Sequence, residues 1–166
     1  MNGLIMGTRS GDIDQSVIFH MIDELGYSVD EVKSLLQEKS GMLGLTGYSD
    51  LREIETEASQ GDEACNLALK MNAYRVKKYI GAYTAAMNGL DALVFTAGIG
   101  ENSDLLRSLI CADMEFFGIH LDEDKNRVRE HSIREIQTDG AEVSLLVVPT
   151  NEELEIAKQS FRLLSP

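Results

Sequence analysis

The sequence predicts an α/β fold that is rich in helices and contains a small sheet. Helical apolar patterns outnumber short strand patterns along the 166 residues, and the predicted strands are joined through helices. Hydrophobic residues make up 43% of the chain, which suffices for a core, because a compact chain of about 150 residues buries roughly 70% of its unfolded surface. The charged fraction of 26% and only two prolines argue against a disordered chain. The length fits one domain, or at most one and a half.

A glycine turn and two helices are predicted first. Residues 7–12 have no amphipathic spacing and are predicted to form an exposed turn from which an arginine projects. Asp12 or Asp14 can cap the helix that follows, whose apolar residues recur every three or four positions. Ser28 and Glu31 have the spacing of a capping box, which predicts the start of a second helix.

A glycine-rich segment separates these helices from the longest periodic stretch. Glycines interrupt the apolar pattern over residues 40–48, which are predicted to be a loop or short turns. Asp50 followed by Glu53 indicates another helix start. Residues 62–88 are predicted to form one long helix, because their apolar side chains return in steps of three and four residues. This apolar stripe consists of Leu69, Ala73, Val76, Ile80, Tyr83 and Met87.

The second half contains short strand patterns between helices. Residues 92–95 are predicted to be a strand buried on both faces, followed by a loop at residues 96–103 and a helix at about 103–112. Residues 144–148 form a second apolar strand, and residues 131–138 are expected to supply a third. These segments account for the small sheet.

The last predicted helix follows a proline after the second apolar strand. Thr150 and Glu153 have the spacing of a capping box, and the apolar residues after them step by three and four. The charged stretch over residues 121–134 has no clear period, and the chain has no internal repeat or low-complexity tract. The last predicted element is therefore an amphipathic helix.

Charge and composition narrow the possible partners. The chain has 15 Lys and Arg residues and 28 Asp and Glu residues, so its net charge is −13. Nucleic acid is an unfavourable partner, because such binding depends on Lys and Arg neutralising phosphates, and any anionic ligand needs local positive groups or a metal ion. No apolar run approaches the roughly 18 residues of a membrane helix, and residues 1–7 are too short and glycine-rich for a secretory signal. Cys65 and Cys111 form no CxxC pair, so we expect free thiols and a cytoplasmic protein without membrane association.

A Gly-x-Gly turn after the first predicted strand is the strongest local candidate for a ligand site. Gly98 and Gly100 precede a predicted helix start, where a phosphate or sugar can approach backbone N–H groups closely. The turn lacks the third glycine of the dinucleotide fingerprint and the Gly-Lys-Ser/Thr of a Walker loop. A plain strand-to-helix turn is an equally good interpretation of this pattern.

Three other segments are weaker candidates. Arg9 can aim its planar guanidinium at a carboxylate or phosphate, although a surface ion pair with Asp12 or Asp14 is the simpler interpretation. Glu152 can bind Mg²⁺, although acidic residues are common in a first helical turn because of the helix dipole. For residues 50–52, helix capping by the aspartate and exposure of the arginine are the default. No Ser-His-Asp or Cys-His arrangement has a recognisable spacing.

The order of four motifs is more specific than any one of them. The motifs at residues 7–14, 49–52, 95–103 and 148–153 together closely resemble the acetate kinase family, and the resemblance extends over essentially the whole chain. That family belongs to the superfamily of actin-like, sugar-kinase-like and Hsp70-like ATPases, with a ribonuclease-H-like fold and two lobes around a nucleotide cleft. The resemblance therefore implies this fold and an enzyme that uses ATP and Mg²⁺ to phosphorylate acetate reversibly, giving acetyl phosphate and ADP.

The resemblance also implies roles for individual residues. Arg9 would stabilise the transferring phosphoryl group, and Glu152 would be a Mg²⁺ ligand. A further nucleotide contact would come from Asp50, Leu51 and Arg52. The adenosine-side loop would consist of Gly98, Ile99, Gly100, Glu101 and Asn102. Family members are typically homodimers joined through this lobe, so a homodimer is expected.

The sequence departs from this family in lacking everything that precedes the Arg9 motif. The preceding half supplies the first phosphate-binding loop, the substrate-contacting arginine, the catalytic aspartate and a histidine, and none has a counterpart here. Residues 1–166 are therefore expected to be the C-terminal nucleotide-binding and dimerisation lobe, inactive by itself, with most of the acetate pocket absent. The alternatives are a non-catalytic dimerisation or interaction lobe and a part of a propionate or butyrate kinase.

Overall fold

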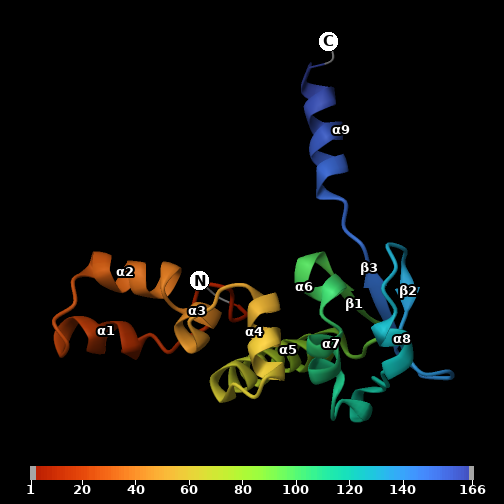
Figure 1. Cartoon of the computed structure of the whole chain (residues 1–166), viewed down its shortest axis with the longest axis horizontal. Coiled ribbons are helices and arrows are strands. Elements are labelled where there is room, and N and C mark those ends of the chain that lie inside the picture. The colour runs from red at the N-terminus through yellow and green to blue at the C-terminus, as the bar shows by residue number, and fades with distance from the viewer. Residues whose placement is uncertain (1–2, 165–166) are drawn as a thin grey trace. The chain divides into compact units, whose positions relative to one another are not determined.

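The computed structural model describes residues 3–164, so residues 1–2 and 165–166 of the predicted lobe lie outside the described part. The chain forms two compact units that divide between Ala86 and Met87, at the end of a long helix (Figure 1). Helices predominate among the described residues, and strands occur only in the second unit as one small sheet. The predicted helix-rich α/β composition is therefore confirmed. Within residues 3–164 no helix is both long and apolar enough to cross a membrane.

The described part of the first unit is built from helices. They are α1 (Ser16–Asp23), α2 (Val29–Glu38), α3 (Gly41–Thr46), α4 (Leu51–Ser59) and α5 (Glu63–Met87). The predicted capping box opens α2, because the backbone N of Glu31 donates to Oγ of Ser28 at 3.3 Å and the backbone N of Ser28 donates to the Glu31 carboxylate at 2.8 Å. Asp50 caps α4 as predicted, accepting from the backbone N of Arg52 at 2.9 Å.

The turn before α1 uses its two aspartates differently. Asp14 makes the capping contact, since its Oδ1 accepts from the backbone N of Ser16 at 2.8 Å and from its hydroxyl at 2.7 Å. Asp12 makes no such contact and instead accepts from the hydroxyl of Tyr79 on α5. Of the two aspartates that the sequence left open, Asp14 is therefore the one that contacts the start of α1, although the N-cap position is Gln15, whose side chain makes no capping hydrogen bond.

The prediction of a loop over residues 40–48 is wrong, because most of this segment forms α3. The backbone N–H groups of Met42 and Leu43, in its first turn, donate to the carbonyls of Met6 and Gly7 at 2.9 Å each. The first backbone N–H groups of a helix have no acceptor within the helix, and here carbonyl groups far away in the sequence accept from them. These contacts offset the low helix propensity of the glycines.

Helix α5 matches the long helix predicted over residues 62–88, but its apolar stripe is buried only in part. Leu69 and Ile80 lie in the core, as does Ala73 between them. Tyr83 and Met87, at the end of the same stripe, are exposed. The predicted core face therefore covers only the earlier turns of the helix.

The second unit contains a three-stranded sheet and short helices. Its elements are β1 (Ala92–Thr96), α6 (Ala97–Asn102), α7 (Asp104–Cys111), η1 (Glu115–Phe117), α8 (Glu123–Arg127), β2 (Arg134–Glu135), β3 (Ser144–Val148) and α9 (Glu152–Leu164). The strand order is β1-β3-β2, with β1 parallel and β2 antiparallel to β3. Leu145 and Val147 on β3 are fully buried and form the core together with Ile119 and Ile136.

Three predictions for this unit are wrong in detail. β1 is not buried on both faces, since it is an edge strand and only Phe95 among its five residues is buried. Most of the segment predicted to be a loop, residues 96–103, forms a short helix, α6. The third strand, β2, has only two residues, and a single bridge between Leu121 and Gln137 extends the pairing of that region. The predicted helix over residues 103–112 is confirmed as α7.

The capping box predicted at Thr150 and Glu153 does not form. Asn151 caps α9 instead, accepting from the backbone N of Leu154 at 2.9 Å. Thr150 is committed elsewhere, because its backbone N and its hydroxyl both donate to the carboxylate of Glu101. Thr150 therefore contacts α6, and the local cap of α9 comes from Asn151.

Candidate functional site

The predicted site residues fall into four short segments, two in each unit. Arg9 and residues 50–52 belong to the first unit, and residues 98–102 and Glu152 belong to the second. In the first unit the two segments adjoin, since a Cβ added to Gly7 would lie only 3.1 Å from the carbonyl oxygen of Ser49. In the second unit the sheet brings the two segments to the same edge.

The loop that carries Arg9, residues 3–12, is fixed mainly through its own backbone. Besides the two hydrogen bonds to α3, the carbonyl of Thr8 accepts from the backbone N of Ser40 at 3.0 Å, and the backbone N of Ser10 donates to the carbonyl of Leu36 at 3.1 Å. The Arg9 carbonyl accepts from the backbone N of Met6 at 3.1 Å, inside the loop. Backbone contacts on both sides of Arg9 therefore set the direction in which its side chain leaves the loop.

Gly41 lets α3 lie directly against this loop. A Cβ at Gly41 would come within 2.2 Å of the Met6 carbonyl oxygen and 2.6 Å of the Arg9 carbonyl oxygen, and φ of Gly41 is +64°. A side chain at distances below 3.0 Å would force the loop backbone to shift, and a positive φ also disfavours one. The close packing around the Arg9 backbone therefore depends on this glycine.

Asp12 anchors the far end of the loop to α5. Its carboxylate accepts from the Tyr79 hydroxyl at 2.5 Å and from the backbone N of Gly3 at 2.7 Å, and Arg75 donates to its carbonyl at 3.0 Å. The hydrogen bond from Tyr79, followed by that from Gly3, holds the pKa of Asp12 below its ordinary value. The predicted surface ion pair of Arg9 with Asp12 or Asp14 is absent, and the exposed Arg9 guanidinium has no hydrogen bond or ion pair to residues 3–164.

Residues 50–52 form the exposed start of α4. The Arg52 guanidinium turns back onto the Asp50 carboxylate, with Nε at 3.0 Å from Oδ1, although the Arg52 side chain is 90% exposed. This hydrogen bond, with the one from the Arg52 backbone, lowers the pKa of Asp50 to about 2. Leu51 is partly exposed beside them. Capping by Asp50 is thus confirmed, and Arg52 is paired rather than free.

Helix α6 holds the Gly-x-Gly pattern in two different environments. A Cβ at Gly98 would meet nothing within 4 Å, whereas a Cβ at Gly100 would lie 3.1 Å from the backbone carbon of Phe95. Gly98 therefore keeps an outer surface of α6 open, and Gly100 lets the helix pack on β1. Exposed Asn102 closes the helix by donating to the carbonyl of Gly98 at 2.8 Å, and Ala97 starts it with a φ of +59°, an unfavourable value for alanine.

The buried side chain of Arg107 donates hydrogen bonds to the backbone of α6. It was not among the predicted site residues. It is 2% exposed, and its Nη1 donates to the carbonyls of Gly100 and Glu101 at 2.8 and 3.0 Å. Its Nε and Nη2 donate to Oδ1 and the carbonyl of Asn126 at 2.7 and 2.8 Å. Burial, followed by the charge of Arg134, lowers the pKa of Arg107. An arginine on the buried face of an amphipathic helix was the available signal.

Glu101 joins α6 to the turn that precedes α9. Its Oε1 accepts from the backbone N of Thr150 at 2.7 Å and from the Thr150 hydroxyl at 2.9 Å. The backbone hydrogen bond from Thr150 is the main reason why the pKa of Glu101 lies below its ordinary value. Glu152 lies two residues after Thr150. Its side chain is exposed and has no hydrogen bond or ion pair to the described residues.

The described residues could hold a metal ion only together with oxygen atoms of a bound ligand. Within residues 3–164 no group of three or more His, Cys, Asp or Glu side chains is placed to hold a metal ion. Mg²⁺ is commonly bound by one or two carboxylates together with phosphate and water oxygens. The single free carboxylate of Glu152 therefore suits a Mg²⁺ ion that arrives with a phosphorylated ligand.

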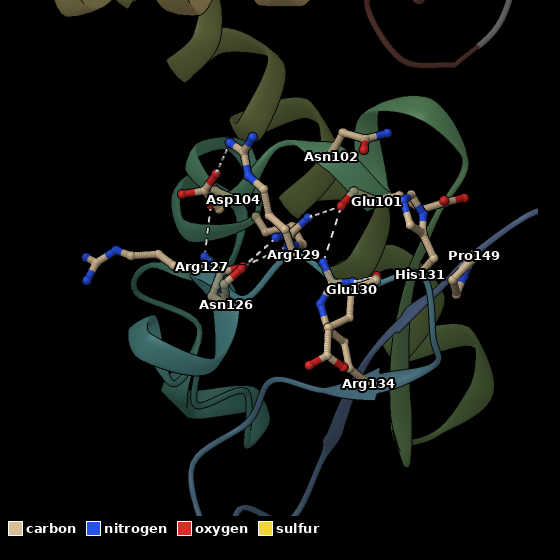
Figure 2. A pocket seen from close by; sticks show the side chains of 11 residues that line it. Glu101, Asn102, Asp104, Asn126, Arg127, Arg129, Glu130, His131, Arg134 and Pro149 are labelled. Carbon is tan, nitrogen blue, oxygen red and sulfur yellow. Dashed lines mark hydrogen bonds and ion pairs between the residues drawn. The ribbon is translucent and has the colours of Figure 1, made fainter.

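A pocket of about 190 Å³ lies between α6, α7 and the segment before β2 (Figure 2). Its lining combines five basic residues with three acidic ones in a chain of net charge −13. The basic residues are Arg107, Arg127, Arg129, His131 and Arg134. The acidic residues are Glu101, Asp104 and Glu130. Asn102 and Pro149 also line this pocket, which therefore reaches from α6 to the turn before α9.

Comparison with known proteins gives one consistent result. The sequence matches the family described as the Acetokinase family over residues 1–158. It is 64% identical over 163 residues to the acetate kinase of Flavobacterium johnsoniae, covering 98% of this chain and 41% of that relative. It is 51% identical over 164 residues to the acetate kinase of Carboxydothermus hydrogenoformans, covering 99% and 41%.

Solved structures agree with the sequence comparison. The acetate kinase of Porphyromonas gingivalis is 44% identical and superposes with a TM-score of 0.89, covering 99% of this chain and 41% of that one. A propionate kinase from Francisella tularensis is 40% identical, with a TM-score of 0.86 over 95% and 40%. The predicted fold class is therefore confirmed, and the chain spans about two fifths of the length of these relatives.

Proposed function

The chain belongs to the acetokinase family, and from this premise we propose that it is the C-terminal part of an acetate kinase. The complete enzyme would transfer the γ-phosphoryl group of ATP reversibly to acetate, giving acetyl phosphate and ADP, in the cytoplasm. The chain would contribute nucleotide binding, one phosphoryl-stabilising arginine and one Mg²⁺ ligand. Homodimerisation would also take place through this part.

The observation that carries the proposal is the fixed loop around Arg9 with its unengaged guanidinium. Phosphoryl transfer requires mainly positioning and charge stabilisation, because acetate is already a competent nucleophile. A guanidinium whose backbone is held in advance can meet the charge on the equatorial phosphoryl oxygens without reorganising. Asp50, Leu51 and Arg52, in the adjoining segment, would contact the nucleotide.

In the second unit, α6 would provide the adenosine side of the site. Gly98 and Ile99 offer an exposed surface, since nothing lies within 4 Å of a Cβ at Gly98 and Ile99 is 51% exposed. Gly100 and Glu101 hold the helix against the sheet and the following turn, and Asn102 is exposed at its end. A Mg²⁺ ion held by Glu152 would offset phosphate charge in this acidic chain.

A chimeric enzyme tests the proposed activity directly. In it, this chain replaces the matching part of the acetate kinase of Flavobacterium johnsoniae, and acetyl phosphate formed from ATP and acetate is measured. We expect activity, and we expect Arg9→Ala to lower kcat by about 10²–10³-fold, the usual effect of losing one transition-state donor. Arg162→Ala, a change at an exposed arginine near the end of α9 that does not line the pocket, is the matched control. An inactive chimera, or equal loss in both variants, would refute the proposal.

The chain by itself should bind nucleotide but not turn it over. We expect no acetyl phosphate above the buffer level from the purified 166-residue chain, and weak, Mg²⁺-assisted binding of ADP in isothermal titration. Turnover by the chain alone would contradict the first expectation. Absence of heat at millimolar ADP would count against an intact half-site.

Two alternatives make different predictions. A non-catalytic dimerisation lobe would give a stable dimer in size-exclusion chromatography and no effect of nucleotide on thermal unfolding. The similarity to a propionate kinase at 40% identity favours, as a second candidate, a longer carboxylate as the acceptor. In the chimera, most of the carboxylate pocket would come from the Flavobacterium johnsoniae part. The preference for acetate or propionate is therefore measured as kcat/KM in the complete enzyme that contains this chain.

A further inference from the structure

One carboxylate oxygen of Glu101 accepts hydrogen bonds from a residue that lies 49 positions away in the sequence. Oε1 accepts both the backbone N–H and the hydroxyl of Thr150, at 2.7 and 2.9 Å. Resting on the proposed function, which assigns Glu152 to Mg²⁺, we infer that Glu101 is a positioning residue. It fixes the turn before α9 and thereby orients Glu152 towards the metal ion of a bound nucleoside diphosphate.

The sheet explains why these two segments meet. β1 and β3 are parallel and in register, with Thr96 opposite Val148, so α6 and the turn before α9 leave the same edge of the sheet. The Thr96 hydroxyl donates to the Val148 carbonyl at 2.7 Å and holds the two strand ends together. Ligands of parallel sheets bind at the carboxyl ends of the strands, where Glu101 and Thr150 lie.

Beyond this edge, little else holds the turn. Pro149 has no N–H to donate, and the hydrogen bonds of Asn151 go to the backbone of Leu154 and Glu155 within α9 itself. All residues of α9 that the structure describes are exposed, so packing of its side chains does not fix its first turn. The two hydrogen bonds to Glu101 are therefore the main restraint on the backbone that leads to Glu152.

The charge of Glu101 also favours this role over direct contact with a nucleotide. A charge-assisted hydrogen bond from a backbone N–H to a carboxylate is among the stronger ones, and the Glu101 carboxylate already accepts one from Thr150. Gly98 and Asn102, on the same helix, present neutral groups that do not repel an anion. Helix α6 can therefore face a nucleotide while its one acidic side chain holds the neighbouring turn.

The first measurement follows the turn without any ligand. In the purified chain, hydrogen exchange of the Thr150 backbone amide is recorded by NMR for Glu101→Ala and for Glu115→Ala, a matched change at an exposed glutamate on η1. We expect exchange at Thr150 to become at least about tenfold faster in Glu101→Ala, the effect of losing a charge-assisted hydrogen bond. Glu115→Ala should leave it unchanged. Unchanged exchange in Glu101→Ala would overturn the inference.

The second measurement separates positioning from nucleotide contact. The dissociation constant of ADP is determined by isothermal titration with and without Mg²⁺ for the unmodified chain, Glu101→Ala, Glu101→Gln and Glu152→Ala. We expect Glu101→Ala to abolish the gain in affinity that Mg²⁺ provides, as Glu152→Ala does, and to leave metal-free ADP binding within about twofold. Glu101→Gln retains an acceptor oxygen for Thr150 and should restore part of the gain.

The outcomes distinguish this inference from the proposed function. If metal-free ADP binding falls in Glu101→Ala, Glu101 contacts the nucleotide directly and the positioning role is wrong. If Mg²⁺ still strengthens ADP binding in Glu101→Ala as in the unmodified chain, the positioning role alone is wrong. If Mg²⁺ has no effect even in the unmodified chain, the proposed metal role of Glu152 fails and this inference fails with it.

Discussion

The Arg9 loop and helix α6 are both predicted ligand segments, but the protein holds them by different means. The Arg9 loop is fixed by backbone hydrogen bonds to α2 and α3 and by the close approach of Gly41. Helix α6 is fixed by side chains, with Arg107 on its carbonyls and the Glu101 carboxylate on Thr150. A side chain added at Gly41 would collide with the backbone of the Arg9 loop, whereas each side-chain contact that holds α6 can be removed by a single substitution.

The difference suits what each segment would do. A phosphoryl-stabilising arginine must be placed before the reaction, so a loop fixed through its backbone is suitable for Arg9. A segment that admits and releases a nucleotide benefits from contacts that are individually weaker. The following predictions test this contrast, in order of decreasing expected effect.

Gly41→Ala should be the most damaging change. The new Cβ would lie 2.2 Å from the Met6 carbonyl oxygen at a φ of +64°, so we expect a loss of about 3–4 kcal/mol in the free energy of unfolding. Gly47→Ala is the matched control, because its φ is +84° but nothing lies within 4 Å of the added Cβ. It should cost about 1–2 kcal/mol. Urea unfolding measures both, and equal losses would contradict tight packing at Gly41.

Arg107→Met should destabilise the second unit by about 2–3 kcal/mol. The substitution removes a buried guanidinium and its hydrogen bonds to the carbonyls of Gly100, Glu101 and Asn126, of which the Glu101 carbonyl keeps a longer one from Arg134. Arg127→Met, at an exposed arginine, should stay within about 0.5 kcal/mol. Hydrogen exchange resolves the location, with the largest increase expected in α6. An increase confined to other elements would show that Arg107 does not support α6.

Gly100→Ala and Gly98→Ala separate packing from ligand access within α6. At Gly100 the new Cβ would press on the Phe95 backbone at 3.1 Å and should cost about 1–2 kcal/mol. At Gly98 the Cβ meets open space, so stability should be unchanged or rise by about 0.5 kcal/mol, since alanine suits helices better than glycine. ADP binding, measured by isothermal titration, should nevertheless weaken in Gly98→Ala. Unimpaired ADP binding there would mean that the nucleotide does not approach this surface.

The smallest effect should come from Asp50 and is visible as a pH dependence. Its pKa of about 2 in the folded chain lies below the ordinary value of 3.8, so its ionised form stabilises the fold above pH 3.8. That contribution is lost as the pH falls through about 2. Arg52→Met removes the principal cause, and NMR titration of the Asp50 carboxyl carbon should then give a midpoint closer to 3.8. A midpoint near 3.8 in the unmodified chain would contradict the contact with Arg52.

Sequence patterns predicted local contacts well and distant ones poorly. The capping box at Ser28 and the cap at Asp50 were predicted because both partners lie within three residues. Glycine-rich segments at residues 40–48 and 96–103 were predicted as loops but form helices. In each case contacts from outside the segment stabilise the helix. For the first they come from the distant carbonyls of Met6 and Gly7, and for the second from buried Arg107, which lies beyond the helix's own turns.

By itself, the sequence determined the helix-rich α/β class, the caps of α2 and α4, and the order of motifs that relates this chain to the acetokinase family. These features depend on residues a few positions apart, where chain connectivity already enforces proximity. Only the tertiary structure decided that Arg107 lies beneath α6, that Glu101 holds Thr150, and that Arg9 stands free of its neighbouring aspartates. The contacts of Glu101 and Asp12 join groups dozens of residues apart, and hydrogen-bond partners at that separation are chosen by the packing of whole elements.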